Sequence, residues 1–215
     1  YAVHQCARFT YCPKQSHAEA IKRICRYLQG TRKEGLHFKP DKVMTLNCYA
    51  DADFAGLWSV EHDQDPVCVK SRTGYVLTLA NCPLVWASKL QSEIACSTLE
   101  SEYIALSSAL RELIPLRRLL QEVGNALNLE FSKPSIVQST CFQDNNGALQ
   151  LASSPKMTPR TKHIGVKYHF FKSHIGIEKG IVIKRVDSAF QKADIFTKGL
   201  TEVTFKSIRK QLMGW

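Results

Sequence analysis

One long helical pattern near the middle of the chain constrains the fold more than any other feature. Apolar residues recur at helical spacing between residues 97 and 124. They include Tyr103, Leu106, Leu110, Leu113 and Leu120. Ser97 or Thr98 is suited to cap the N-terminus, and Pro115 is expected to kink the helix or to split it near Leu113. We therefore expect this helix to lie at the centre of a hydrophobic core.

Strand-like segments precede the helix. Residues 45–53 alternate between apolar and polar side chains, which is the period of a β-strand. Residues 73–79 and 84–87 are rich in β-forming side chains. Between them, the Asn-Cys-Pro sequence at residues 81–83 is typical of a turn that joins antiparallel strands.

The part of the chain after the long helix alternates strands with helices. A strand ends at residues 141–143 and passes directly into a helix, and a second helix is expected at residues 163–174. Gly180 precedes another strand, and residues 191–200 are expected to form a short helix. The full order, three strands, helix, strand, two helices, strand and helix, describes an α/β fold with a mixed sheet.

A separate helix is expected before the first strand, from about Ser16 to Gly30. It carries a single apolar stripe and therefore needs a partner surface. The segment either packs on the domain that follows or is the end of a domain that lies upstream.

Composition points to a polyanionic partner. The 215 residues carry a formal net charge of +10, and the basic residues are spread over several segments. The alternative is that they only solubilise helix faces. The eight cysteines form no close Cys-x-x-Cys pair and lie mostly in apolar stretches, so we expect reduced thiols and a reducing compartment. The absence of an apolar run of about 20 residues favours a soluble, non-secreted protein.

Four acidic residues stand where a sheet and its helices can bring them together. Asp51 and Asp144 end apolar strands, Glu102 lies in the first turns of the long helix, and Asp194 lies near the start of the last short helix. Carboxylates grouped in this way repel one another unless a cation lies between them, and their hard oxygen atoms select Mg²⁺ or Mn²⁺.

Each acid also has a purely structural interpretation. Glu102 and Asp194 are favoured in early helical turns by the helix dipole, and Asp144 is suited to a turn and helix cap. Asp51 and Asp53 share a strand face, but they do not begin a calcium loop, because Ala55 and His62 occupy positions that need oxygen ligands. No single acid is decisive by itself.

Seven short motifs in order resemble those of copia-type retrotransposon RNase H domains. The motifs are YADADFAG at 49–56, SRTGY at 71–75, WASK at 86–89, STLESEYIAL at 97–106, DNNGAL at 144–149, TKHI at 161–164 with YHF at 168–170, and ADIFTK at 193–198. The resemblance implies an RNase H-like mixed five-stranded sheet with helices on both faces. It also implies a division into the end of a reverse transcriptase at residues 1–40, an RNase H-like domain at 41–200 and a helical tail at 201–215.

The same resemblance assigns residues to a catalytic centre. Asp51, Glu102, Asp144 and Asp194 match the acids that hold two Mg²⁺ ions, for which Mn²⁺ can substitute; Glu100 is the less favoured choice within its motif. Asp53 is kept as a supporting residue.

This chain departs from the family pattern at two positions. Gly165 stands where an acidic residue is common, and residues 186–192 lack the mobile histidine that many RNase H enzymes carry. His163 could replace that histidine only if the fold brought it close to the acids, and a structural role for it is favoured.

The implied activity is hydrolysis of the RNA strand of RNA–DNA hybrids during reverse transcription. Asn145 and Asn146 are candidates for contacts with the RNA 2′-hydroxyl, with turn formation as the alternative, and Lys162 and Lys198 for contacts with phosphates. The expected partners are the hybrid and the reverse transcriptase domain of the same polyprotein, with no membrane. We expect a cytoplasmic location in a virus-like particle, or a nuclear one.

Two other functions remain open from the sequence. A decayed element could retain the fold as a catalytically inactive nucleic-acid-binding module. A transposase or integrase relative would act on DNA, with an acidic triad at another spacing, and the ADIFTK motif favours RNase H over that alternative.

Overall fold

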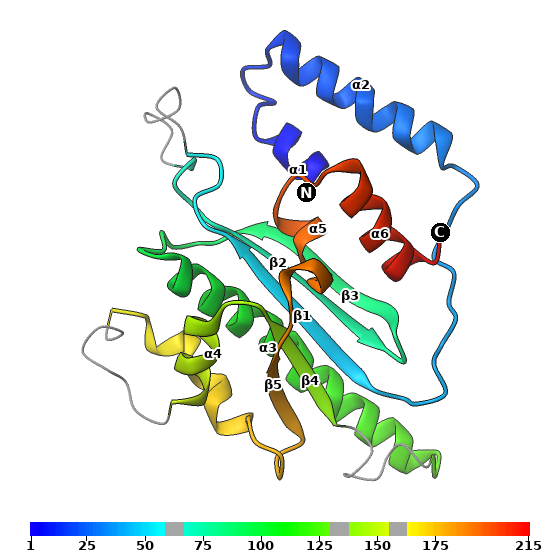
Figure 1. The fold of residues 1–215 in the computed structure, drawn as a ribbon, viewed down its shortest axis with the longest axis vertical. Helices are drawn as coiled ribbons and strands as arrows, with labels where there is room; N and C mark the ends of the chain where they lie inside the picture. Colours follow the sequence, from blue (N-terminus) through cyan, green and yellow to red (C-terminus); the bar gives the residue numbers. More distant parts are fainter. Residues whose placement is uncertain (59–66, 130–137, 155–162) are drawn as a thin grey trace.

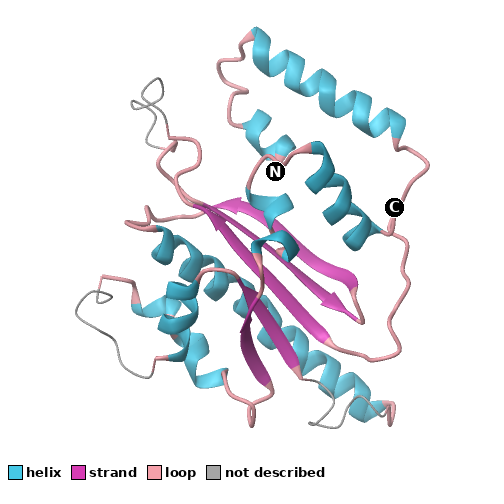
Figure 2. Ribbon diagram, viewed as in Figure 1, coloured by secondary structure: helices cyan, strands magenta, loops and turns pink. Residues whose placement is uncertain are grey.

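A computed structural model describes residues 1–58, 67–129, 138–154 and 163–215. Its centre is a five-stranded sheet in the order β3-β2-β1-β4-β5 (Figure 1). The strands are β1 (Leu46–Asp53), β2 (Arg72–Leu79), β3 (Cys82–Leu90), β4 (Ser139–Gln143) and β5 (Ile181–Arg185). The helices around it lie on both faces of the sheet (Figure 2). The predicted α/β fold, a mixed five-stranded sheet with helices on both faces, is therefore confirmed.

Strand directions explain where polar groups can gather. β1 pairs antiparallel with β2, and β2 pairs antiparallel with β3, whereas β1, β4 and β5 run parallel. The pairing of β1 with β4 extends from Leu46↔Ser139 to Tyr49↔Phe142 and goes no further. Beyond Tyr49 and Phe142, the carboxyl ends of the two parallel strands therefore leave space for side chains and a ligand.

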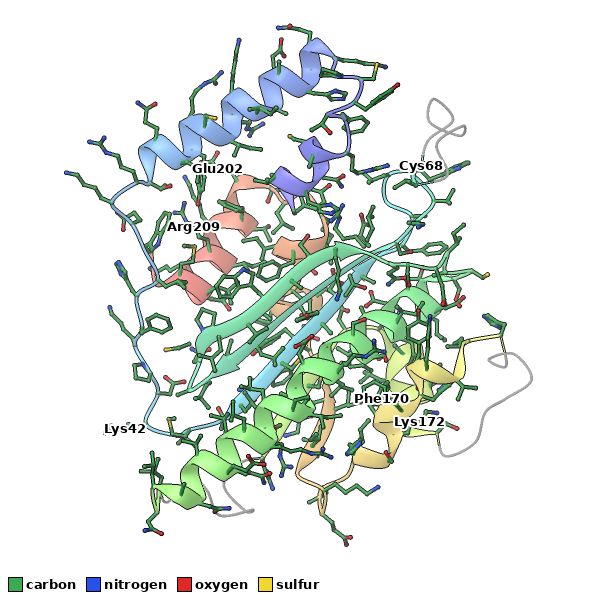
Figure 3. The ribbon with its side chains drawn as sticks, turned by 180° about the vertical axis from the view of Figure 1, so that it is seen from behind. Lys42, Cys68, Phe170, Lys172, Glu202 and Arg209 are labelled. Carbon is green, nitrogen blue, oxygen red and sulfur yellow. The ribbon has the colours of Figure 1, made fainter. Side chains whose placement is uncertain are left out.

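The large hydrophobic core lies between the sheet and α3 (Thr98–Ala126), which crosses one face of it (Figure 3). The predicted helical stripe supplies this core, since Tyr103, Leu106, Leu110 and Leu113 are all fully buried. α4 (Asn146–Ser153) and two short 3-10 segments, Val166–Tyr168 and Phe170–His174, pack on the same side.

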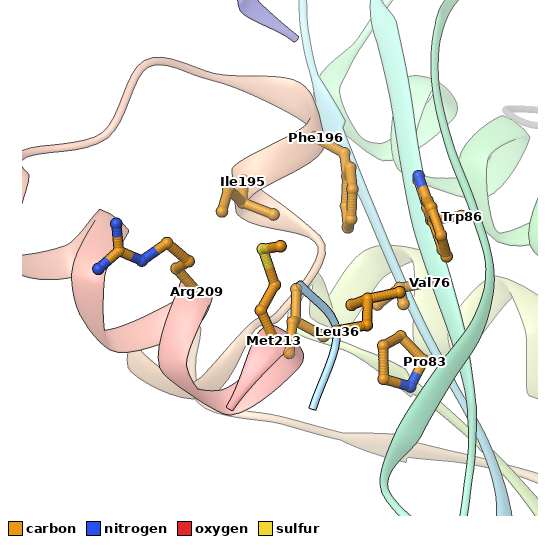
Figure 4. Close-up of a pocket in the computed structure, with 9 residues that line it drawn as sticks. Leu36, Val76, Pro83, Trp86, Ile195, Phe196, Arg209 and Met213 are labelled. Carbon is orange, nitrogen blue, oxygen red and sulfur yellow. The ribbon is translucent and has the colours of Figure 1, made fainter. Parts of the chain in front are cut away.

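The opposite face carries a much smaller cluster. α5 (Asp194–Thr197) and α6 (Glu202–Met213) cover it, and Val76, Ile208 and Leu212 are its buried residues. A pocket of about 330 Å³ remains between α6, α5 and strands β2 and β3 (Figure 4). Its walls are mostly apolar and include Phe196 and Trp86.

The N-terminal segment contributes nothing to either core. α1 (Ala2–Ala7) and α2 (Gln15–Gly30) contain no buried residue. α2 lies beside α6, where the rings of Tyr27 and Phe205 meet edge to face at 5.8 Å (Figure 1). The backbone N–H of His37 donates to the carbonyl of Met213 at 3.0 Å, so the connection to β1 is tied to the end of α6. The predicted helix at residues 16–30 is confirmed, and most of its apolar stripe remains exposed.

Three local predictions need correction. Of the two outcomes expected at Pro115, a kink or a split, the split does not occur, because α3 runs without a break from Thr98 to Ala126. The carbonyl that loses its helical partner belongs to exposed Arg111. The hairpin turn is Ala80-Asn81, both with positive φ (47° and 65°), so Cys82 already belongs to β3.

The third correction concerns residues 163–174, which form 3-10 segments in place of an α-helix. Tyr168 and Phe171 are both buried, and a 3-10 helix aligns residues three positions apart on one side. All eight cysteines are free, as expected. None of the helices in the described residues is long and apolar enough to span a membrane.

Candidate metal centre

Three of the four predicted acids meet at the carboxyl ends of β1 and β4. Asp51 lies near the end of β1, Asp144 directly follows β4, and Glu102 extends from the second turn of α3. One carboxylate oxygen from each lies within 4.8 Å of those of the other two. Asp51 and Glu102 are only 2% and 5% exposed, so this concentration of negative charge is shielded from water.

Gln143 holds two of the three acids in place. Its Nε2 donates to Glu102 Oε2 at 3.2 Å, and its Oε1 accepts the backbone N–H of Asp144 at 2.8 Å. Glu102 Oε2 also accepts the N–H of Ala52 at 3.1 Å, where β1 is no longer paired with β4. Since Gln143 is fully buried, these bonds fix the Glu102 carboxylate and the backbone of Asp144 relative to the strand ends.

The Asp51 carboxylate is supported from α5. Thr197 donates its hydroxyl to Asp51 Oδ2 and is itself fully buried. α5 can approach this closely because Gly74, which pairs with Asp51 across β1 and β2, has no side chain. A Cβ at Gly74 would lie 2.6 Å from Thr197 Cγ2 and 2.9 Å from Phe196 Cβ. Gly74 is therefore required by close packing.

Asp194 lies at the same end of the sheet but outside the group of three. Its Oδ1 forms an ion pair with Lys198 Nζ at 3.0 Å, and the same ammonium lies 3.8 Å from Asp51 Oδ2. Lys198 therefore links the fourth acid to the first. Asp144 has a different support, the hydroxyl of Ser188 at 2.9 Å from its Oδ2.

Burial and mutual repulsion disfavour the charged forms of these acids. Burial, followed by the carboxylates of Asp51 and Asp144, raises the pKa of Glu102 to about 9. Burial and Asp51 raise the pKa of Asp194 to about 7, although Lys198 acts in the opposite direction. Burial also raises the pKa of Asp51, against the lowering effect of Lys198. A cation among the carboxylates would relieve this repulsion.

The donor set fits a hard divalent ion. The group of three offers only carboxylate oxygens, from three different elements and at mutual distances that allow one ion to contact all of them. Mg²⁺ and Mn²⁺ prefer such ligands, whereas zinc prefers nitrogen and sulfur.

Two nearby acids have other roles. Glu100 accepts the N–H of Cys96 at 2.7 Å at the start of α3, and it lies 3.3 Å from His163 Nε2. These contacts match the structural role expected for His163 and the choice of Glu102 over Glu100. Asp53 is half-buried and is not part of the group formed by Asp51, Glu102 and Asp144.

The side chains predicted to contact nucleic acid differ in how far the structure leaves them available for that contact. Asn146 is exposed at the start of α4, beside the acids. The side-chain oxygen of Asn145 accepts the backbone N–H of Ala148 at 3.0 Å and so caps α4. The side-chain NH2 of Asn145 is left to contact RNA. Lys198 contacts carboxylates. Lys162 and the basic loop around it lie outside the described residues.

The sequence prediction missed the residues that position the acids. These residues are uncharged: Gln143 and Thr197 contribute hydrogen bonds, and Gly74 contributes space. Their residue types alone therefore do not indicate a role at a metal centre. A glycine inside a strand pattern was the only available indication, since it marks a close approach by another segment.

Similar sequences occur in transposon polyproteins. The chain is 32% identical over 213 residues, 99% of its length, to the retrovirus-related Pol polyprotein from transposon RE1 of Arabidopsis thaliana. It is 36% identical over 214 residues to the corresponding polyprotein from transposon TNT 1-94 of Nicotiana tabacum. The chain spans only 13% and 15% of the length of these two relatives.

Structural similarity is more distant. The N-terminal RNase H domain of a Mycobacterium tuberculosis protein matches 76% of this chain and 98% of that domain, with 14% identity and a TM-score of 0.47. No family model matches the sequence.

Proposed function

This chain belongs to the retrovirus-related Pol polyproteins of copia-type transposons, and from that premise we propose that it is the ribonuclease H of such a polyprotein. The proposed reaction is the hydrolysis of the RNA strand of an RNA–DNA hybrid during reverse transcription. The observation that carries the proposal is the convergence of Asp51, Glu102 and Asp144 within 4.8 Å at the ends of two parallel strands.

We assign the metal ligands to Asp51, Glu102 and Asp144, with Asp194 as the fourth acid. Two Mg²⁺ ions, or Mn²⁺ in their place, would supply activation of water and neutralisation of the charge that develops on the phosphate. The chain's own contribution is to present charged oxygens in fixed positions. Gln143 orients Glu102, Ser188 orients Asp144 and Thr197 orients Asp51, which lowers the reorganisation needed when a substrate binds.

The preference for RNA over DNA requires a group that recognises the 2′-hydroxyl. Asn146 is the stronger of the two predicted candidates because it is exposed next to Asp144, whereas Asn145 caps α4. The net charge of +10 supports salt-sensitive binding to the phosphate backbone.

We also propose a context for the reaction, which the family supports. The expected partners are an RNA–DNA hybrid and the reverse transcriptase part of the polyprotein, to which we assign residues 1–40 as its end. The RNase H domain would then span 41–200, with 201–215 as a helical tail that packs on the sheet through Ile208 and Leu212. A cytoplasmic virus-like particle, or the nucleus, is the proposed location.

Cleavage of a labelled substrate tests the proposal. The protein is incubated in Mg²⁺ or Mn²⁺ with an RNA–DNA hybrid, and separately with duplex DNA, each strand carrying its own label. We expect cuts in the RNA strand of the hybrid alone, and none in EDTA. Cuts in duplex DNA would favour the transposase-like alternative, and binding of the hybrid without any cut would favour an inactive binding module.

A further inference from the structure

Lys198 occupies an unusual position for a nucleic-acid-binding lysine. Its ammonium lies 3.0 Å from Asp194 Oδ1 and 3.8 Å from Asp51 Oδ2, inside the group of acids. The next residue along the chain is Gly199, and α5 ends immediately before Lys198, whose N–H bonds to the Asp194 carbonyl at 3.2 Å. The backbone therefore fixes where this ammonium can reach.

The ammonium stands where a bridging cation would have to bind. Asp51 belongs both to the group of three acids and to the pair that contacts Lys198. A divalent ion held by Asp51, Glu102 and Asp144 still leaves Lys198 its closer partner, Asp194, at 3.0 Å. An ion that bridges Asp51 and Asp194 would lie where the Lys198 ammonium now contacts both carboxylates. The ion and the ammonium would repel each other there, because both are positively charged.

The side chain is able to leave. Lys198 is 41% exposed, whereas the carboxylates it contacts are 3% and 10% exposed. Its long aliphatic stem allows the ammonium to swing into solvent while the backbone stays in place. The acids cannot move in the same way, since Thr197 holds Asp51 and α5 packs against β2.

We propose that Lys198 is a built-in counter-ion that holds the second cation position of this centre, and that a second divalent ion binds only by displacing its ammonium. This inference rests on the proposed function, because it assumes that the acids bind divalent ions. It assigns different affinities to the two positions: the group of three acids binds first, and the position between Asp51 and Asp194 binds more weakly.

We expect the displaced ammonium to contact the bound nucleic acid as well. Once it leaves the carboxylates, it lies in solvent at the edge of the centre, within reach of a phosphate oxygen of a bound strand. Binding of the second ion and of nucleic acid would then favour each other, since both stabilise the released form of Lys198. The lysine thereby offsets part of the negative charge of Asp51 and Asp194 in the absence of substrate.

Mn²⁺ titration without nucleic acid tests the proposal. The whole chain and its Lys198→Met and Lys198→Gln variants are titrated, with bound Mn²⁺ followed by isothermal calorimetry and by electron paramagnetic resonance. Lys206→Met is the matched control, because Lys206 forms an i,i+4 pair with Glu202 at 2.6 Å on exposed α6, as Lys198 does with Asp194. Asp51→Asn identifies binding at the acid centre.

The expected result is a tight and a weak Mn²⁺ ion in the wild type, with the weak one tightened about tenfold or more in both Lys198 variants, the range for a lost charged hydrogen bond. Lys206→Met should match the wild type. Identical affinities in the wild type and the Lys198 variants would overturn the inference alone. Absence of any Mn²⁺ binding that depends on Asp51 would overturn both the inference and the proposed function.

Discussion

The two faces of the sheet differ in how firmly they hold the acids. On the α3 face, Glu102 extends from a 29-residue helix whose first half is anchored by the fully buried side chains of Tyr103, Leu106, Leu110 and Leu113. On the other face, Asp194 is carried by α5, a four-residue helix, next to a pocket of about 330 Å³. Asp51 and Asp144 lie in the sheet between them. The well-packed face therefore presents its acid to a fixed group of three, while the thinly packed face presents an acid that is paired with a lysine.

The difference indicates that the two faces have different functions in the metal centre. A site that must hold a cation at all times benefits from rigid ligands, and a site that must release one during a reaction benefits from adjustable ligands. Variants that change residues on one face only test whether the two faces differ in this way.

The largest effect is expected from the group of three. Asp51→Asn, Glu102→Gln and Asp144→Asn should each lower the rate of hybrid cleavage by roughly 10³-fold or more, since a metal ion contributes several kcal/mol to the transition state. Asp194→Asn should cost less, about 10- to 100-fold. Single-turnover cleavage rates measure both, with circular dichroism as the control for folding. An Asp194 variant as inactive as the other three would remove the distinction between the faces.

A smaller effect is expected from the two cores. Leu110→Ala on α3 should lower the free energy of unfolding by about 3–4 kcal/mol, because its side chain is fully buried in the larger cluster. Leu212→Ala on α6 should cost about 1–2 kcal/mol, since its surroundings already contain a pocket. Urea unfolding compares the two variants. Equal losses would show that the second face is packed as well as the first.

Gly74→Ala should loosen α5 without changing any charge. The added methyl group meets Thr197, Phe196 and the carbonyl of Ala193, so we expect a loss of about 1–3 kcal/mol and slower cleavage. Gly199→Ala is the matched control, because a Cβ there has nothing within 4 Å. The melting temperatures and cleavage rates of Gly74→Ala and Gly199→Ala are compared. Equal values for the two variants would refute the close-packing role of Gly74.

The pH dependence of stability should be modest and have a definite sign. Burial and neighbouring carboxylates raise the pKa of Glu102 to about 9, above its unfolded value. The folded protein therefore binds protons more strongly, and the stability of the metal-free protein should fall, by the order of 1 kcal/mol or more, as pH rises from about 4.5 towards 9.

Glu102→Gln should remove much of this decrease, and Mn²⁺ should oppose it in the wild type, because metal binding requires the deprotonated carboxylates. Urea unfolding from pH 5 to 9 in EDTA measures the trend. Stability that rises over this range in the absence of metal would contradict the assigned repulsion.

The sequence predicted the elements and the acids more successfully than their supports. Strong periodicity located the segment around Leu110, and the resemblance to copia-type motifs, more than any local pattern, selected Asp51 and Glu102. Gln143 and Thr197 act through tertiary hydrogen bonds that no local pattern reveals. For the same reason, the contact of Lys198 with Asp51 could not be predicted, because it depends on how α5 packs against β1.

The central claim is that Asp51, Glu102 and Asp144 form a divalent metal site, and anomalous X-ray diffraction from crystals grown with Mn²⁺ tests it most directly. We predict a manganese peak within bonding distance of an oxygen from each of the three carboxylates. A well-ordered centre without manganese, or manganese bound only elsewhere on the chain, would contradict the account.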